Sequence, residues 1–280
     1  MNKLNAIGAP FNINHSSCYH HKPKLFEWTG GPEYPTVVMD RAITRSDMLD
    51  GKPNKYAWVC ESRAILPNHD QILKNPRVRS SYKKIFISDK TKLHLGPNLV
   101  YCPAGSNLPW LPILDEPPLK NKMCSMIASP KTGCSGHNYR HRVARKYMSQ
   151  LDLYGGACNS PRFGFDNKTT DGHPDKSSAI VPYRFSVVME NDSYPDYFTE
   201  KITDCFASWT VPIYWGCPTI GDNFNIDGII IFTDGFDVSS LTVELYEKML
   251  PAIEENNKIV QQLQMADDVL YTNIMKEEEK

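Results

Sequence analysis

The sequence has no apolar run long enough to cross a membrane. A membrane-spanning helix needs about 20 mostly apolar residues, and no run approaching that length occurs in the chain. The first residues, Met1 to Ala6, also lack the apolar stretch of a secretory signal peptide. Together these absences predict a cytoplasmic protein with no membrane span.

The chain also lacks an excess of charge of either sign. It carries 31 Lys and Arg against 32 Asp and Glu, for a net charge of −1 over 280 residues. A nucleic-acid surface is therefore not expected. A basic cluster does occur locally, at Arg140, Arg142, Arg145 and Lys146. The content of 41% hydrophobic and 22% charged residues is that of an ordinary globular protein, and the length suits two small domains or one large one.

No cysteine pair has the C-x-x-C spacing of a zinc or thioredoxin-type motif. In a protein without a secretion signal, we expect the cysteines to be reduced and mostly buried. They are Cys18, Cys60, Cys102, Cys124, Cys134, Cys158, Cys205 and Cys217.

Short apolar runs that end in polar residues predict the buried strands of parallel sheets. The first half has four such runs and a helix near 68–73, after a lead-in of residues 1–33 that we expect to be loose, with short strands as an alternative. Its predicted strands are 36–40, 56–60, 84–89 and 99–102. The second half has five predicted strands, at 122–129, 151–156, 183–190, 211–216 and 229–232. Its predicted helices are 138–150 and 199–208, followed by a helical stretch over 239–275 broken near Pro251.

A proline-rich segment separates the two halves and predicts a linker. Its prolines are Pro103, Pro109, Pro112, Pro117 and Pro118. We therefore predict an α/β protein with a first domain over 1–115, a second over 120–240, and C-terminal helices over 241–280. Ligands of open α/β sheets bind at the carboxyl ends of the strands, which here indicates Glu61, the loop 129–140 and the segment 190–201.

The segment 183–217 carries the most specific chemistry. A strand ends at Glu190 and Asn191, and a helix opens with Thr199, Glu200 and Lys201. The free N–H groups of a helix N-terminus, together with a lysine, favour a pyrophosphate. A glutamate on the same turn could accept hydrogen bonds from sugar or ribose hydroxyls. The segment therefore predicts a site for a nucleotide sugar.

These blocks resemble the α-1,3-fucosyltransferase family, glycosyltransferase family 10. The family signature has a strand ending in E-N, then Y-x-T-E-K, then a strand with P-I/V-Y-W-G. Here the three blocks are Phe185 to Asn191, Tyr197 to Lys201, and Val211 to Gly216. Their shared order and spacing make the resemblance specific.

The resemblance extends more weakly over residues 55–235. Gly136 to His141 is similar to the family's helix start, whose arginine contacts the donor phosphates; Arg140 is the match and Arg142 the alternate. Trp58 to Glu61 resembles a strand that ends in the glutamate proposed as general base in the family.

The resemblance implies a GT-B fold, with two Rossmann-like domains facing a central cleft. It also implies a GDP-fucose donor bound by the second domain, a glycan acceptor on the side of the first, and inversion at the anomeric carbon. The catalytic base would be Glu61, and the donor-binding residues would be Arg140, Asn191, Tyr197, Glu200 and Lys201. Since the chain has no D-x-D motif and offers cations for the phosphates, we expect no obligatory cofactor or metal.

Several alternatives stay open from the sequence. Donor-side blocks recognise phosphates and ribose more than the sugar, so another nucleotide sugar fits the same fold. A non-catalytic member that binds a nucleotide or a glycan is a further possibility. Glu61 could instead pair with Arg63 or Lys83 at its strand end, and Arg140 could belong to a solvated basic helix face. The sequence predicts neither the acceptor nor the oligomeric state.

Overall fold

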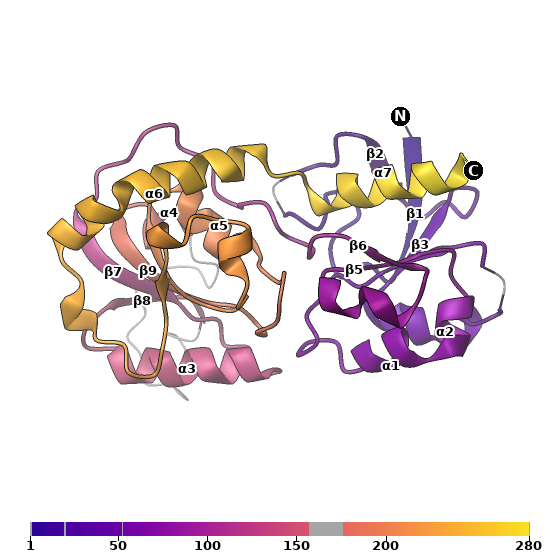
Figure 1. Ribbon diagram of the computed structural model, residues 1–280, viewed down its shortest axis with the longest axis horizontal. Coiled ribbons are helices and arrows are strands. Elements are labelled where there is room, and N and C mark those ends of the chain that lie inside the picture. Colours follow the sequence, from indigo (N-terminus) through magenta and orange to yellow (C-terminus); the bar gives the residue numbers. More distant parts are fainter. Residues whose placement is uncertain (1, 20, 52, 157–175, 280) are drawn as a thin grey trace. The chain divides into compact units, whose positions relative to one another are not determined.

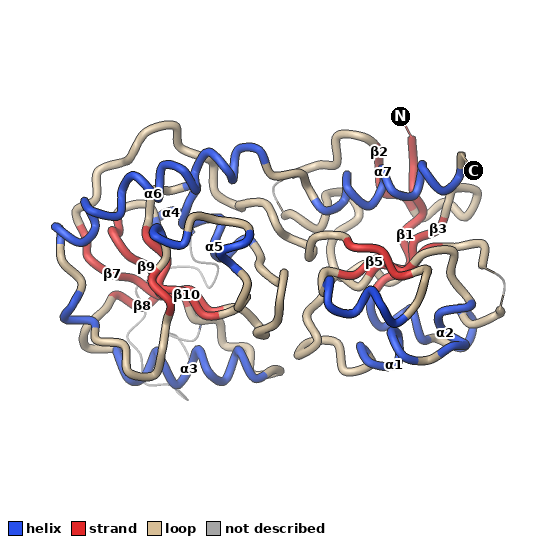
Figure 2. Tube along the Cα trace, in the orientation of Figure 1, coloured by secondary structure: helices blue, strands red, loops and turns tan. Residues whose placement is uncertain are grey.

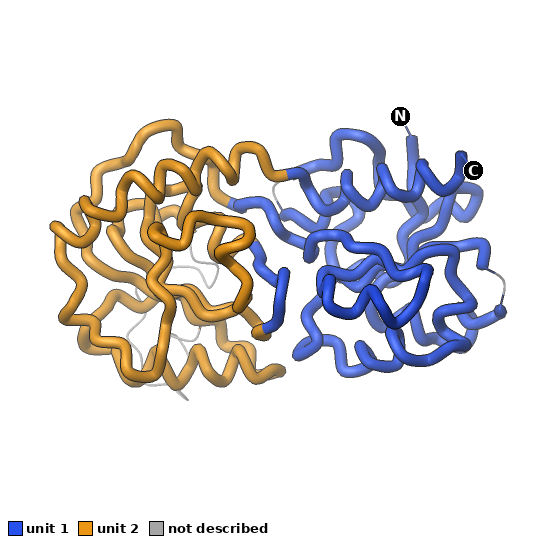
Figure 3. The backbone as a smooth tube through the Cα atoms, in the orientation of Figure 1, with its two compact units in different colours: residues 1–110, 194–199, 264–280 blue, residues 111–193, 200–263 orange. Residues whose placement is uncertain are grey.

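The computed structural model describes residues 2–19, 21–51, 53–156 and 176–279. The chain forms two compact units, shown in different colours in Figure 3. The first contains residues 1–110, 194–199 and 264–280, and the second contains residues 111–193 and 200–263. Cys158, one of the cysteines predicted to be reduced, lies outside the described residues.

The first unit is built on a six-stranded parallel sheet of order β2-β1-β3-β4-β5-β6. Its strands are β1 (Asn2–Ile7), β2 (Phe26–Thr29), β3 (Thr36–Met39), β4 (Tyr56–Trp58), β5 (Ile85–Ile87) and β6 (Leu99–Tyr101). The four strands predicted in this half are confirmed. Of the two alternatives for residues 1–33, the short strands are present, because this lead-in supplies β1 and β2. Polar residues such as Asn2 and Asn5 interrupt the apolar pattern of β1, although Leu4 is fully buried.

Two apolar clusters cover opposite faces of this sheet. On one face, Leu270 and Ile274 of α7 (Ala266–Glu278) pack with Trp58 of β4. On the other, α1 (His69–Lys74) and α2 (Pro76–Ser80) pack with Ala57 of the same strand. Successive residues of a strand point to opposite faces, so β4 contributes to both clusters. Figure 1 shows α7 on one side of the strands and α1 and α2 on the other.

The second unit contains a five-stranded parallel sheet of order β11-β10-β9-β7-β8. Its strands are β7 (Lys122–Ile127), β8 (Asp152–Tyr154), β9 (Tyr183–Met189), β10 (Val211–Trp215) and β11 (Ile230–Ile231). Its helices are α3 (Ser135–Tyr147), α4 (Lys176–Ile180), α5 (Glu200–Ala207) and α6 (Val243–Gln262). In Figure 2 the strands of this sheet run between α3 and α6. The central strand β9 is covered on both faces, which explains its nearly continuous apolar sequence.

The C-terminal helices differ from their prediction in where the chain breaks. Helix α6 continues through Pro251, and the break falls between Gln262 and Ala266. Pro251 is exposed, so the carbonyl group left without its usual N–H partner can be hydrated. The two helices also divide between the units, because α6 belongs to the second and α7 to the first. The first division of the chain follows residue 110 rather than 115.

The cysteine prediction is confirmed for the described part of the chain. Its seven cysteines are all free and buried. Burial raises the pKa of the Cys124 thiol to about 12, so that group stays protonated near neutral pH. Among the described residues, no helix combines the length and the apolar character needed to cross a membrane.

Candidate functional site

The polar residues singled out in the second unit gather where β9 ends and two helices begin. Helix α3 starts against the last residues of β9, and Gly136 in its first turn makes this approach possible. A Cβ atom at Gly136 would overlap the carbonyl oxygens of Glu190 and Asn191. Only glycine therefore lets the start of α3 lie directly on the Glu190–Asn191 backbone.

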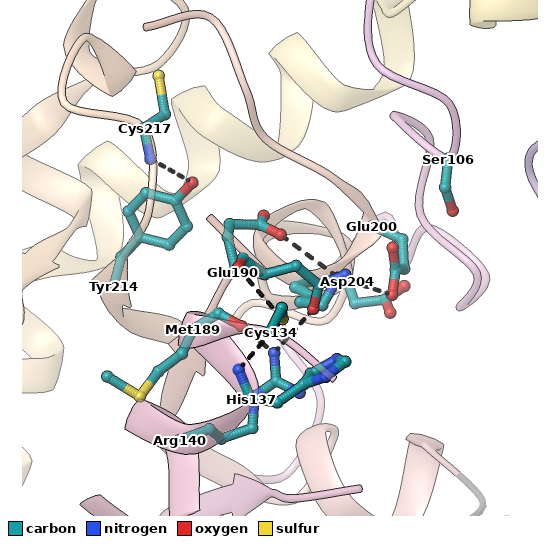
Figure 4. A network of polar contacts seen from close by, with 12 residues as sticks. Ser106, Cys134, His137, Arg140, Met189, Glu190, Glu200, Asp204, Tyr214 and Cys217 are labelled. Carbon is teal, nitrogen blue, oxygen red and sulfur yellow. Dashed lines mark hydrogen bonds and ion pairs between the residues drawn. The ribbon is translucent and has the colours of Figure 1, made fainter. Parts of the chain in front are cut away.

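Arg140 is hydrogen-bonded to the end of β9. Its guanidinium donates to the carbonyl oxygen of Met189 at 2.6 Å and to Oδ1 of Asn191 at 3.4 Å, as Figure 4 shows for the carbonyl contact. The residue is only 7% exposed. Arg142, the alternate, instead lies over the ring of Tyr139 with its guanidinium carbon 4.8 Å from the centroid. The structure thus places Arg140 within the cluster, rather than on a solvated helix face.

Lys201 lies between two carboxylates at the start of α5. Its Nζ is 3.3 Å from Oε2 of Glu190 and 3.6 Å from Oε1 of Glu200. The Glu190 side chain has no exposed surface, whereas that of Lys201 is 23% exposed. The buried carboxylate fixes the direction of the lysine stem, while the ammonium group still reaches solvent.

A second lysine extends this chain of alternating charges. Nζ of Lys176 lies 3.2 Å from Oε1 of Glu200 and 2.8 Å from Oδ2 of Asp204. Asp204 is fully buried and its Oδ1 accepts the backbone N–H of Leu111 at 2.9 Å. Burial lowers the pKa of Lys176, but the two carboxylates outweigh it, so its pKa lies above the usual value. Glu200 is therefore held between two ammonium groups.

The surroundings of His137 show that this region is electropositive. Burial, together with the charges of Arg140, Lys131 and Lys201, lowers the pKa of His137 to about 4. The imidazole is consequently neutral near pH 7. Positive charge and the N–H groups at the start of the 13-residue helix α3 act in the same direction, and both favour an anion.

The remaining predicted residues belong to the first unit. Glu61 follows β4 and is partly buried. Among the described residues its carboxylate forms no ion pair; Lys83 pairs with Glu278, and Arg63 lies over the ring of Tyr194. The alternative of a strand-end ion pair with Arg63 or Lys83 is thus not what the structure shows.

Tyr197, predicted to bind the donor, is only 2% exposed. It stacks on Tyr194 with ring centroids 4.7 Å apart, and both pack with Ala104. The neighbouring Asp196 forms an ion pair with Lys90, with Nζ and Oδ1 2.9 Å apart. The structure thus gives Tyr197 a packing role within the first unit.

Sequence reasoning missed three residues of these clusters. Glu190 was recognised as part of a motif but not as the buried partner of Lys201. Lys176 stands outside every motif block. Asp40 follows β3 as a polar residue at a strand end, the signal that selected Glu61, and its Oδ1 accepts the backbone N–H groups of Cys60 and Glu61 at 2.8 and 3.3 Å.

Parts of the chain are similar to known proteins. Residues 117–240 match the family model described as glycosyltransferase family 10 (fucosyltransferase), C-terminal part. The chain is 41% identical over 115 residues to the alpha-(1,3)-fucosyltransferase FucT of Helicobacter pylori, covering 40% of this chain and 21% of that protein. It is 33% identical over 76 residues to alpha-(1,3)-fucosyltransferase B of Drosophila melanogaster, covering 27% of this chain and 17% of that protein.

Two solved structures are similar in fold. A crystal structure of an alpha1,3-fucosyltransferase with GDP aligns with a TM-score of 0.55 and 14% identity, over 95% of this chain and 92% of that one. The pneumococcal O-GlcNAc transferase GtfA, solved with UDP and GlcNAc, aligns with a TM-score of 0.52 and 13% identity, over 87% of this chain and 56% of that one.

The two parallel α/β units and these neighbours define the class of the protein, which has a GT-B fold. Within that class, residues 117–240 are similar to glycosyltransferase family 10. The sequence blocks at 185–191, 197–201 and 211–216 had predicted this family. The chain matches about a fifth of the length of its curated relatives.

Proposed function

We propose that the protein transfers fucose from GDP-fucose to a hydroxyl group of a glycan acceptor, with inversion at the anomeric carbon. The observation that carries this proposal is the grouping of Arg140, Lys201 and Glu190 at the end of β9. These residues lie inside the segment that matches the fucosyltransferase family. An α1,3-fucosyltransferase of similar fold was solved with GDP.

The cluster suits the diphosphate of a nucleotide sugar. Arg140 and Lys201 supply positive charge, and the first turns of α3 and α5 supply backbone N–H groups. Glu200 supplies carboxylate oxygens that can accept from sugar or ribose hydroxyls, and the ion pair with Lys176 orients it. Asn191 completes the donor-binding set that we propose; Tyr197 acts at most through the packing of its segment.

The proposed reaction is a direct displacement. Glu61 accepts the proton of the acceptor hydroxyl as its oxygen bonds to the anomeric carbon. The bond between that carbon and the phosphate oxygen breaks, and the nucleoside diphosphate leaves with the electron pair. Arg140 and Lys201 stabilise the charge that develops on the leaving group. In this scheme the leaving group depends on protein cations, and GDP-fucose is a substrate rather than a cofactor.

A different donor is the second candidate. The O-GlcNAc transferase that shares this fold was solved with UDP, and its TM-score is close to that of the fucosyltransferase. The fold therefore does not distinguish a guanine from a uracil nucleotide. The segment match to fucosyltransferases favours GDP-fucose.

Thermal stabilisation by a panel of nucleotides separates these candidates. A ligand at 100 times its dissociation constant adds about 2.7 kcal/mol to the free energy of unfolding. We expect GDP and GDP-fucose to raise Tm and UDP and CMP to leave it unchanged. A shift with UDP alone would support the second candidate. Binding of GDP without turnover by any donor would identify a non-catalytic member, and loss of turnover with retained GDP binding in Glu61→Gln would support the assigned base.

A further inference from the structure

Asp40 is an unusual residue at the carboxyl edge of the first sheet. It directly follows β3, and it adopts φ 48°, a left-handed backbone conformation that side chains other than glycine, asparagine and aspartate rarely accept. It is 5% exposed. Strained backbone of this kind persists where the surrounding structure holds it in place.

The Asp40 carboxylate holds the backbone of the neighbouring strand end. Strands β3 and β4 are paired with Met39 opposite Trp58, and the ladder stops there. Oδ1 of Asp40 then accepts the N–H groups of Cys60 at 2.8 Å and of Glu61 at 3.3 Å. A side-chain oxygen thus accepts both N–H groups beyond the end of the ladder, and the peptide that carries Glu61 is held at both residues.

The second carboxylate oxygen of Asp40, Oδ2, differs from Oδ1 in its hydrogen bonding. Oδ2 is buried and, within the described part of the chain, it has no hydrogen-bond partner. Leaving a buried carboxylate oxygen unpaired costs about 1–3 kcal/mol or more. The structure therefore keeps a costly buried group where it binds the Cys60–Glu61 backbone. An asparagine tolerates this φ and keeps an acceptor oxygen, so it could serve the same two N–H groups.

We propose that Asp40 is a positioning residue for Glu61: it fixes the Cys60–Glu61 peptide, and thereby the carboxylate that accepts the proton of the acceptor hydroxyl. This inference rests on the role of Glu61 given under the proposed function. A shift of about 1 Å in a reacting group can cost about 100-fold in rate. Among the described residues, the Asp40 carboxyl group accepts from backbone N–H groups and forms no ion pair, so it acts through Glu61.

The test compares Asp40→Asn with Asp40→Ala. Asparagine keeps an acceptor oxygen for the two N–H groups, whereas alanine removes it. We expect Asp40→Ala to lower kcat by about 10- to 100-fold, with GDP affinity unchanged, and Asp40→Asn to retain most of the activity. The double variant Asp40→Ala/Glu61→Gln should be no slower than Glu61→Gln alone, because both changes remove the same function.

Asp89 offers a matched control for effects on stability alone. It is a buried aspartate that follows β5, and its Oδ1 accepts the N–H of Thr91 at 3.0 Å. Asp89→Ala should lower Tm and leave kcat per folded molecule unchanged. The positioning role is overturned if Asp40→Ala keeps its kcat, or if Asp40→Asn loses as much as Asp40→Ala. An active Glu61→Gln variant would instead overturn the assignment of the base, independently of Asp40.

Should Asp40→Ala fail to fold, Asp40→Gly provides the same removal of the acceptor with a residue suited to positive φ. The same fall in kcat is expected for it. Wild-type kcat in a folded Asp40→Gly variant would contradict the proposal.

Discussion

The Nζ atom of Lys201 lies 3.3 Å from Oε2 of Glu190, a carboxylate with no exposed surface. This pair joins the end of the central strand β9 to the first turn of α5. Removing the ammonium group leaves a buried carboxylate without its cation and removes a charge from the proposed diphosphate site. We therefore expect Lys201→Met to lower kcat/KM by about 100-fold or more and to abolish stabilisation by GDP.

Lys258→Met is the control for this change. Lys258 pairs with Glu254 on the exposed face of α6, with side chains 63% and 50% exposed. Such a surface pair contributes at most about 1 kcal/mol. GDP stabilisation and turnover should match wild type in this variant. Equal losses in the two variants would show that the effect of Lys201 is not specific to the site.

The geometry of Arg140 predicts that lysine cannot replace it. Nη2 of Arg140 donates to both the Met189 carbonyl and the Asn191 side chain. The planar guanidinium presents its further N–H donors in a fixed geometry that an ammonium group does not reproduce. We expect Arg140→Lys to weaken GDP binding by about 10-fold or more, since each 1.4 kcal/mol is tenfold in affinity. Arg142→Lys, whose guanidinium lies over Tyr139, should bind GDP as wild type does. Isothermal titration with GDP checks both, and the opposite ranking would restore Arg142 as the donor-binding arginine.

The close approach of α3 to β9 predicts a sharp difference between two glycines. A Cβ atom at Gly136 would overlap two backbone carbonyl oxygens, whereas none of the surrounding atoms lies within 4 Å of a Cβ at Gly133. Gly136→Ala should reduce the free energy of unfolding by about 1–3 kcal/mol and weaken GDP binding. Gly133→Ala should change neither. Urea denaturation with and without GDP measures both effects, and a Gly136→Ala variant as stable as wild type would contradict the described contact.

The environment of Asp40 predicts a pH dependence of stability. Burial and, to a smaller extent, the charge of Glu61 outweigh the opposing N–H groups of Cys60 and Glu61 and raise the pKa of Asp40 from 3.8 to about 7. The folded state binds the proton of Asp40 more tightly than the unfolded state does. Asp40 therefore contributes to the free energy of unfolding fully below about pH 4, and this contribution is lost as pH rises to about 7.

The Asp40→Asn variant isolates the contribution of Asp40 titration to stability. The Tm of the variant minus the Tm of wild type should increase between pH 4 and pH 7 and remain level above pH 7. Any constant cost of the amide group cancels in this comparison across pH. A difference in Tm that stays flat over the whole range would show that Asp40 titrates with an ordinary pKa in the folded protein.

The sequence predicted those elements whose apolar pattern is undisturbed. All nine predicted strands are present, including β9, where Phe185, Val187 and Met189 are buried along with their neighbours. Strand β1 could not be given bounds, because its lysine and asparagines interrupt the apolar pattern around the buried Leu4. Pro251 was expected to end a helix, yet its exposed position lets α6 continue. Local sequence does not show which face of an element will be covered.

The sequence predicted those residues of the site that lie in recognisable motifs, and not the others. Arg140, Asn191, Glu200 and Lys201 lie together at the end of β9, and the family blocks had singled them out. Lys176 could not be found in this way, because its contacts with Glu200 and Asp204 join residues 24 and 28 positions away. The burial of Tyr197 likewise depends on packing with Tyr194 and Ala104, which the motif does not encode.

The central claim is the transfer of fucose from GDP-fucose, and the most direct measurement is turnover with defined donors. GDP-fucose and UDP-GlcNAc are each incubated with the protein and a set of glycan acceptors, and the released nucleoside diphosphate and the glycan product are quantified. The account predicts a fucosylated product and GDP from GDP-fucose alone, with both lost in Lys201→Met and retained in Lys258→Met. Transfer from UDP-GlcNAc, with none from GDP-fucose, would contradict it.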